Sequence, residues 1–314
     1  MQQYKSLHLV HPDYLAPIHE INNLVETKGL AGLEEMFSSL GEAHCDERWQ
    51  APAQGSQPAV DLCVYKPKNA RGKLPVIYYC HGGGYLAGNA MMYADMFTDL
   101  AECHKAAVVS VEYRLAPQAP FPADLNDAYH GLVYIHQQAA EFGLDTDKLI
   151  LMGESAGGGL TARLALLVRD KGEFHPVGQV LIYPMLDCRS GTENSPYHQE
   201  YVGEFLWTYE LNRLGWDTLR GGQELDEQQL GYFSPSLAKN LTGLPKTFMI
   251  VGSLDLFVNE DIDYANRLIQ AGVPTDLLVL NGCIHAFDAL NPTAEPTLRY
   301  MEARTRAINE MLAR

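Results

Sequence analysis

Short apolar runs alternate with longer segments of helical period along most of this chain. This alternation predicts an α/β fold with a mostly parallel central sheet, because parallel strands need long crossover connections whose helices cover both faces of the sheet. The predicted strands are Val60–Tyr65, Pro75–Cys80, Ala107–Tyr113, Lys148–Gly153, Gln179–Tyr183, Thr247–Val251 and Asp276–Leu280. The predicted helices are 13–40, Met92–Cys103, Asp124–Phe142, Ala156–Lys171, Asp261–Ala271 and a closing helix from Pro296 onward.

The segment 187–241 departs from this alternation. It is polar and longer than a crossover helix needs, so we predict an insertion there. The chain has 314 residues, of which 46% are hydrophobic, and it shows no internal repeat or low-complexity linker, so we expect a single domain over 1–314. The insertion carries large aromatic side chains that either line a pocket or hold the insertion together: Tyr197, Tyr201, Phe205, Trp207, Tyr209 and Trp216.

The formal net charge of −16 comes from 39 acidic and 23 basic residues, without a basic run. We therefore expect neither nucleic acid nor an anionic membrane surface as a partner, and a strongly anionic substrate would need a basic pocket that the sequence does not reveal. The sequence contains no apolar run of about 18 residues and no secretory signal pattern. Both absences predict a cytoplasmic location. The cysteines agree with it, because without a Cys-x-x-Cys pair they are expected to be buried thiols rather than a disulfide framework or a zinc site.

The strongest chemical motif is Gly153-Glu154-Ser155-Ala156-Gly157, which follows a predicted strand and opens a predicted helix. In that context Gly-x-Ser-x-Gly is the turn that exposes a nucleophilic serine above a sheet. The serine takes a strained conformation there, and glycine on both sides avoids collisions with the neighbouring strand and helix. We predict Ser155 as the nucleophile; the alternative is a turn that merely packs closely.

A second glycine motif, His81-Gly82-Gly83-Gly84, follows another predicted strand. Glycines without Cβ atoms let backbone N–H groups face a developing oxyanion, so we assign the oxyanion hole to the N–H groups of Gly83, Gly84 and Ala156. The alternatives are a flexible turn or a phosphate loop, but no Gly-Lys-Ser/Thr follows. His81 precedes the donors on the same loop, so we expect it to brace the loop rather than act as a base.

Two late residues suit the base and its orienting acid. Asp255 and His285 each stand just beyond a predicted strand. With Ser155 they follow the chain order Ser, Asp, His, which is the order of the catalytic triad in hydrolases whose serine lies in a Gly-x-Ser-x-Gly turn. The competing acids are Asp187, after an earlier strand, and Glu260, Asp261 and Asp263. No His-Glu-x-x-His motif occurs, and His44-Cys45-Asp46 resembles a ligand set only in composition, so we expect no metal site. Five further histidines are expected to be exposed or packed residues without a catalytic role: His104, His130, His136, His175 and His198.

Several separated motifs between residues 75 and 290 together resemble the hormone-sensitive-lipase family of bacterial esterases. They are His81–Tyr85, Tyr113–Pro117 with Phe121–Ala123, Gly153–Gly157, Asp255 and Gly282–Phe287. The residue before the serine is Glu154, where Asp is commoner in that family. The resemblance implies a helical cap built from about 1–42 and 187–241, loop support by His81, Gly82 and Glu154, and hydrolysis of short- to medium-chain acyl esters without a cofactor. It is also compatible with a homodimer formed through a sheet edge.

Three functional classes fit this set of residues: a carboxylesterase, a peptidase or amidase with the same triad, and a non-catalytic receptor for small molecules. The presence of Ser155, His285 and Asp255 disfavours the receptor, because receptors derived from this family have lost a triad member. A peptidase would need an additional domain or a clamp for a substrate terminus, and neither is evident. A serine carboxylesterase that acts on a small neutral ester is the function predicted.

Overall fold

The computed structural model describes residues 4–29, 31–32, 35, 44–197 and 200–313. Its centre is an eight-stranded sheet in the order β1-β2-β4-β3-β5-β6-β7-β8. The strands β2, β4 and β1 pair antiparallel at one edge, whereas β4, β3, β5, β6, β7 and β8 run parallel. The bounds are β1 Glu47–Ala51, β2 Val60–Tyr65, β3 Leu74–Cys80, β4 Ala107–Val111, β5 Leu144–Glu154, β6 Gly178–Ile182, β7 Thr247–Gly252 and β8 Thr275–Leu280. The predicted, mostly parallel α/β sheet is confirmed.

All predicted strands are present, but the prediction missed β1 and began β5 too late. The sequence of β1, Glu-Arg-Trp-Gln-Ala, buries only Trp49 and Ala51. An edge strand needs apolar side chains on one face only, so β1 lacks the continuous apolar run of the central strands. The indole of Trp49 stacks on Phe142, with ring centroids 3.8 Å apart. The early part of β5 is polar and half-exposed, which hid it from the apolar pattern.

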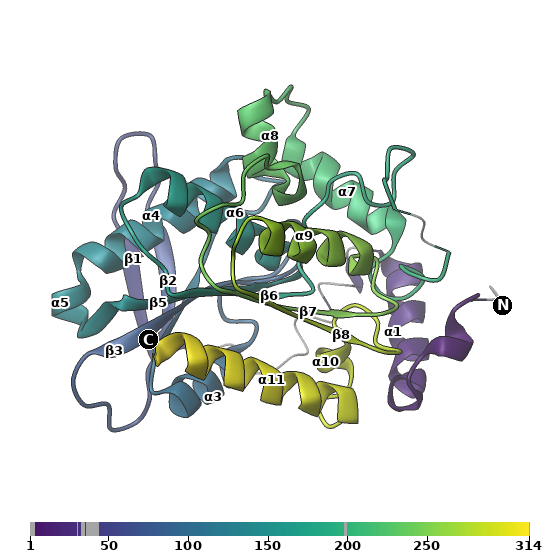
Figure 1. The fold of residues 1–314 in the computed structure, drawn as a ribbon, viewed down its shortest axis with the longest axis horizontal. Helices are drawn as coiled ribbons and strands as arrows, with labels where there is room; N and C mark the ends of the chain where they lie inside the picture. The colour runs from purple at the N-terminus through teal and green to yellow at the C-terminus, as the bar shows by residue number, and fades with distance from the viewer. Residues whose placement is uncertain (1–3, 30, 33–34, 36–43, 198–199, 314) are drawn as a thin grey trace.

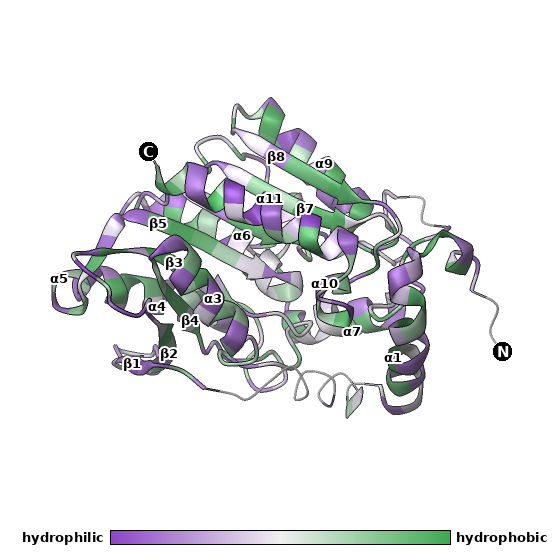
Figure 2. Cartoon of the chain, turned by 90° about the horizontal axis from the view of Figure 1, so that it is seen from below, coloured by the Kyte–Doolittle hydropathy of each residue, from purple (hydrophilic) through white to green (hydrophobic). Residues whose placement is uncertain are grey.

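Helices cover both faces of the sheet, as predicted. In Figure 1, α4, α6 and α9 lie above the sheet and α3 and α11 lie below it. Figure 2 shows hydrophobic residues along much of β5, whereas α11 alternates between hydrophilic and hydrophobic residues as a half-exposed helix does. The predicted helix Asp124–Phe142 is divided at Gln138 into two. The bounds are α3 Ala94–His104, α4 Ala123–Gln137, α5 Ala139–Phe142, α6 Ser155–Lys171, α9 Val258–Gln270, α10 Phe287–Leu290 and α11 Glu295–Leu312.

The N-terminal region contains η1 (Leu7–Leu9), η2 (Pro12–Tyr14) and α1 (Leu15–Lys28). The remainder of the helix predicted over 13–40, and of the cap segment predicted over 1–42, falls partly outside the described residues. Figure 1 places α1 near α7 and α10, at one end of the sheet. Within the described part of the chain, no helix is both long and apolar enough to span a membrane.

The insertion 187–241 contains α7 (Tyr209–Arg220), α8 (Glu227–Phe233) and η3 (Pro235–Leu237). It contacts the N-terminal region, because the Glu204 carboxylate accepts hydrogen bonds from the backbone N–H groups of Lys5 (3.1 Å) and Ser6 (2.7 Å) and from the Ser6 hydroxyl. Tyr4 and Phe205 pack with ring centroids 5.0 Å apart. Of the aromatic residues singled out in this segment, Phe205, Trp207 and Trp216 are buried, whereas Tyr201 is 44% exposed.

Candidate active site

Ser155 stands at the sharp turn between β5 and α6. Its φ is +51°, a left-handed value that is strained for a serine. A Cβ atom on Gly153 would lie 2.4 Å from the carbonyl oxygen of Gly157, and one on Gly157 would lie 2.1 Å from that of Cys80. Glycine is therefore required on both sides of the serine. The turn presents the hydroxyl at the carboxyl edge of the sheet, where parallel strands place ligand-binding loops.

Three predicted side chains meet in a row at this edge. The Ser155 Oγ atom lies 2.9 Å from Nε2 of His285, and Nδ1 of His285 lies 2.7 Å from Oδ2 of Asp255. The other carboxylate oxygen of Asp255 accepts the N–H of Phe257 at 3.0 Å. All three side chains are buried, since their residues are 7%, 4% and 1% exposed in the order Ser155, His285 and Asp255. With Nδ1 donating to Asp255, Nε2 is left free to take the serine proton.

The loops that carry Asp255 and His285 brace each other. They follow the adjacent parallel strands β7 and β8, and the N–H of Leu254 donates to the carbonyl of Cys283 at 3.0 Å. A Cβ atom on Gly252 would lie 2.3 Å from that same carbonyl oxygen. This close approach holds the acid and the imidazole together although they are 30 residues apart in the chain.

The loop of the triple glycine borders the same hydroxyl. Gly83 and Gly84 have φ values of +117° and +64° and line the cavity beside Ser155. Within the described chain, neither of their N–H groups donates a hydrogen bond, so both are available to a ligand. The N–H of Ala156 lies in the first turn of α6, where helix N–H groups have no intrahelical acceptor. The Ala156 side chain itself is fully buried and is not among the residues that border the cavity.

His81 points into its own loop. Its Nδ1 lies 2.8 Å from the carbonyl oxygen of Gly82, and its ring stacks on Tyr113 with centroids 4.2 Å apart. The Tyr113 hydroxyl donates to the carbonyl of His81 at 2.6 Å. Complete burial lowers the pKa of His81 to about 4, so the ring is neutral at physiological pH.

Glu154 lies beneath the glycine loop, since a Cβ atom on Gly82 would be 3.0 Å from its Oε1 atom. Burial, together with the nearby carboxylate of Asp288, raises the pKa of Glu154 to about 8, so the group is mostly protonated at neutral pH. Sequence reasoning missed Asp288 and Tyr183. The Tyr183 hydroxyl donates to Asp288 at 2.8 Å, and its ring meets the His285 ring edge to face with centroids 4.9 Å apart. A tyrosine at the end of a strand carried no signal that separates this role from plain packing.

The cavity beside Ser155 is small, about 20 Å³, which holds roughly one water molecule. Trp207 closes one side of it: a Cβ atom on Gly84 would lie 2.2 Å from the indole Cη2 atom. The indole N–H donates to the side-chain oxygen of Asn212 at 3.2 Å, and the Asn212 amide donates to the carbonyl of Ser190 at 2.8 Å. The preceding residue, Leu206, also lines the cavity and has a φ of +59°. One wall of the cavity, formed by Leu206 and Trp207, therefore comes from the segment 187–241, and Asn212 holds the indole of Trp207 in place.

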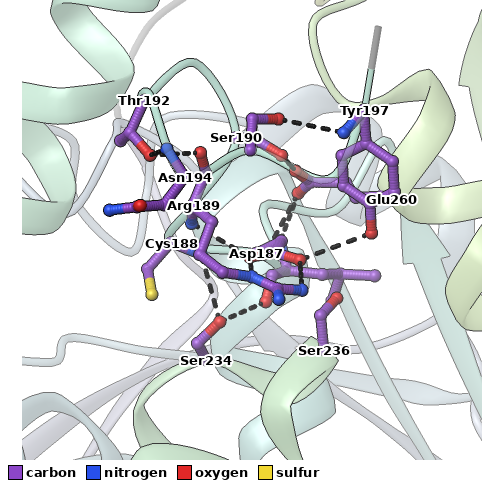
Figure 3. A network of polar contacts seen from close by, with 12 residues as sticks. Asp187, Cys188, Arg189, Ser190, Thr192, Asn194, Tyr197, Ser234, Ser236 and Glu260 are labelled. Carbon is purple, nitrogen blue, oxygen red and sulfur yellow. Dashed lines mark hydrogen bonds and ion pairs between the residues drawn. The ribbon is translucent and has the colours of Figure 1, made fainter.

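The competing acid Asp187 is engaged elsewhere (Figure 3). Its carboxylate accepts hydrogen bonds from the Arg189 guanidinium at 2.9 and 2.6 Å and from the Tyr197 hydroxyl at 3.3 Å. Glu260 accepts the backbone N–H groups of Leu186 (2.7 Å) and Asp187 (3.1 Å), and the Ser190 hydroxyl also donates to it. These two acids join the start of the insertion to α9, away from His285.

The last two competitors do not contact His285 either. Asp261 is fully buried, and within the described residues its carboxyl oxygens have no hydrogen-bond partner. Burial, together with Glu260 and Asp255 nearby, raises the pKa of Asp261 well above its usual value. Asp263 is partly exposed on α9.

The other histidines lie outside the row. His104 pairs with Asn309 through Nδ1 at 2.9 Å, His130 with the carbonyl of Pro52 at 2.8 Å, and the His136 ring stacks on Phe174. His175 is exposed, and His198 lies outside the described residues. Among the residues described, no group of three or more His, Cys, Asp or Glu side chains is arranged to hold a metal ion.

Comparison with known proteins finds similarity to hydrolases and esterases. A family model described as an alpha/beta hydrolase fold matches residues 77–289. Carboxylesterase NlhH of Mycobacterium tuberculosis is 32% identical over 265 residues, which are 80% of this chain and 79% of the relative. A protein of Acanthamoeba polyphaga mimivirus, named as an alpha/beta hydrolase, is 30% identical over 245 residues, 74% of this chain and 66% of the relative. The solved structure of a bacterial heroin esterase covers 98% of this chain and 99% of its own, with 31% identity and a TM-score of 0.86.

Proposed function

Because the chain belongs to the alpha/beta-hydrolase fold family, among the hormone-sensitive-lipase-like esterases, and is a carboxylic ester hydrolase, we propose that Ser155, His285 and Asp255 form its catalytic triad. The observation that carries the proposal is the continuous row of short contacts from the Ser155 hydroxyl through the imidazole to the buried carboxylate of Asp255. Such a row lets a neutral hydroxyl lose its proton as it attacks.

The reaction runs in two halves. The Ser155 oxygen attacks the ester carbonyl carbon while Nε2 of His285 takes the hydroxyl proton, and the carbonyl oxygen becomes an oxyanion. When the intermediate collapses, the bond to the alcohol oxygen breaks, and the imidazolium returns its proton to the departing alcohol, which leaves an acyl-serine. Water then attacks the acyl-serine by the same steps and releases the carboxylic acid. Asp255 keeps the proton of the neutral ring on Nδ1 and stabilises the imidazolium.

The oxyanion is held by the N–H groups of Gly83, Gly84 and Ala156. Fixed donors in a buried site stabilise a developing charge strongly, and the loss of one such donor costs about 3 to 4 kcal/mol in known enzymes. His81, Gly82 and Glu154 support this loop: His81 is stacked and neutral, and the protonated Glu154 places no negative charge beside the oxyanion.

The substrate is a small neutral ester with a short- to medium-chain acyl group, and the short end of this range is favoured. A cavity of about 20 Å³ leaves little room beyond the reacting carbonyl, and the clamped indole of Trp207 prevents its extension. Replacing Trp207 with Ala should move the preferred acyl group toward longer chains. A matched variant, Trp216→Ala, removes an indole that packs on Tyr85 and Phe233 and does not line the cavity, so it should leave the preference unchanged.

A cap over the single domain is formed by two segments, 187–241 and the described part of 1–42. The contacts of Glu204 with Lys5 and Ser6 support this proposal, because they join the two segments. The positions of Leu206 and Trp207 over the cavity support it as well. The acidic net charge and the cysteine pattern support a cytoplasmic location without a nucleic-acid or membrane partner. A homodimer through a sheet edge and the absence of a cofactor rest on the family resemblance alone.

One experiment tests the function and its alternatives. Acyl esters of increasing chain length and a matched panel of amides are assayed with the wild-type protein and with Ser155→Ala. We expect ester hydrolysis that is fastest for short chains, weak amide hydrolysis, and less than about a thousandth of the activity in the variant. Faster cleavage of amides would identify a peptidase or amidase, and binding without turnover would identify a receptor.

A further inference from the structure

A second cavity lies at the opposite end of the sheet from Ser155. Its volume is about 580 Å³, within the range of roughly 300 to 1,000 Å³ that is typical of small-molecule sites. It is bounded by the loop before β3, the end of α3, the start of β5 and the end of α11. Figure 1 shows this end of the molecule, where the C-terminus lies beside β3 and β5, far from α10 and α1.

The charge of this cavity is opposite to that of the whole protein. Four basic residues line it, namely Arg71, Lys73, Lys105 and Lys148, and none of its described lining residues is acidic. The chain as a whole has 39 acidic and 23 basic residues. Cations gathered around one cavity attract an anion, although solvent screens this attraction at the exposed side chains of Arg71, Lys73 and Lys105.

Three of the four cations have no partner among the residues that the structure describes. Lys105 pairs with Glu102 at 2.8 Å. The side chains of Arg71, Lys73 and Lys148 form no ion pair and donate no hydrogen bond to any residue in the described ranges. In a chain with a surplus of carboxylates, unpaired cations that converge on a cavity indicate a binding function rather than a structural one.

Helix ends do not explain the cluster. Both α3 and α11 end at this cavity, and cations often compensate the exposed carbonyl groups of a helix C-terminus. Lys105 is the C-cap residue of α3 and fits that role. Arg71, Lys73 and Lys148 come from other elements, and they make no contact with a helix carbonyl that qualifies as a hydrogen bond in the described chain.

We propose that this cavity binds a small organic molecule that carries a phosphate group. The guanidinium of Arg71 provides the planar pair of donors that suits a phosphate, and Lys73 and Lys148 provide point charges. Leu74, Pro75 and Leu312 form an apolar wall for the organic part of the ligand. His104 contributes no charge, because burial lowers its pKa and Asn309 holds its Nδ1 atom.

Titration calorimetry of the full chain with glycerol 3-phosphate at low ionic strength tests the proposal, with glycerol as the uncharged probe. We expect glycerol 3-phosphate to bind with a Kd of about 1 mM or lower and glycerol not to bind. The double variant Arg71→Gln/Lys148→Gln should weaken binding by at least about tenfold, since each lost charge removes a charge-assisted hydrogen bond. The matched variant Arg213→Gln removes an exposed cation from the distant helix α7 and should bind as the wild type does.

Each opposite result would overturn the proposal. These results are no binding up to about 10 mM phosphate ester, equal binding of glycerol, or equal binding by the double variant. Weakening by Arg213→Gln to the same extent would show that only general charge matters. Loss of binding in Ser155→Ala would place the ligand in the active site instead. If the double variant does not fold, as judged by its thermal unfolding curve, Lys73→Gln takes its place with the same expectation.

Discussion

Two loops at the carboxyl edge of the sheet each carry a buried aspartate, and only one of them reaches the histidine. Asp187 follows β6 and is 0% exposed, and Asp255 follows β7 and is 1% exposed. Asp187 accepts its hydrogen bonds from Arg189 and Tyr197, so a permanent cation neutralises it. Asp255 accepts from the imidazole of His285 and the N–H of Phe257. Burial just beyond a strand therefore does not identify the acid that orients the histidine. The group to which the carboxylate is hydrogen-bonded identifies it.

The largest effect is expected from Asp255→Asn. An amide in this place would stabilise the wrong tautomer of His285, so turnover should fall by about 10⁴-fold, with KM little changed. Stopped-flow or steady-state hydrolysis of a short acyl ester measures this loss. A variant that keeps turnover within about tenfold of the wild type would contradict the role of Asp255.

Asp187→Asn should act on stability instead. The variant leaves Arg189 without its charged partner, at a cost of about 1 to 3 kcal/mol, which is reduced because the Arg189 side chain is 37% exposed and can turn to water. Chemical denaturation measures the free energy of unfolding, and turnover should stay within a few fold. If turnover fell by orders of magnitude while stability held, the acid would lie after β6.

Asp261 is a third buried acid, on α9, and its replacement extends the comparison to pH. Its raised pKa means that the folded state holds a proton that the unfolded state releases, so this group makes the protein less stable as pH rises above the ordinary aspartate range. The Asp261→Asn variant lacks this pH-dependent loss of stability. The free energy of unfolding of the variant relative to the wild type should therefore increase with pH, at up to about 1.4 kcal/mol per pH unit. A difference that is independent of pH would show that Asp261 is ionised in the fold.

The smallest effect is expected from Tyr197→Phe. The Tyr197 hydroxyl lies 3.3 Å from Asp187, the longest of the contacts that this carboxylate makes. Its loss should lower the free energy of unfolding by about 1 kcal/mol or less and leave ester hydrolysis unchanged. A larger loss than that of Asp187→Asn would mean that the tyrosine, rather than the ion pair, holds this loop.

Much of the fold was predictable, because fully buried parallel strands need continuous apolar runs that stand out in the sequence. The exception was the edge strand β1, whose Trp49 and Ala51 lie among polar residues. The outer part of the cavity was not predictable. Trp207 was one of several aromatic residues in the insertion, and its place over Gly84 depends on the turn at Leu206 and on the bond to Asn212.

The sequence by itself determined the features that arise from local sterics: the sharp turn at Ser155 that only flanking glycines permit, and the glycine loop after β3. Tertiary structure alone decided which carboxylate faces His285, how little space lies beside the hydroxyl, and that Arg71, Lys73 and Lys148 surround one cavity. The physical reason is how far apart in the chain the interacting residues are. The strained φ of Ser155, and the collision that a Cβ atom on Gly153 would make with the carbonyl oxygen of Gly157, involve residues close together in the chain. A hydrogen bond across 130 residues, such as that between Ser155 and His285, exists only once the sheet has brought its loops together.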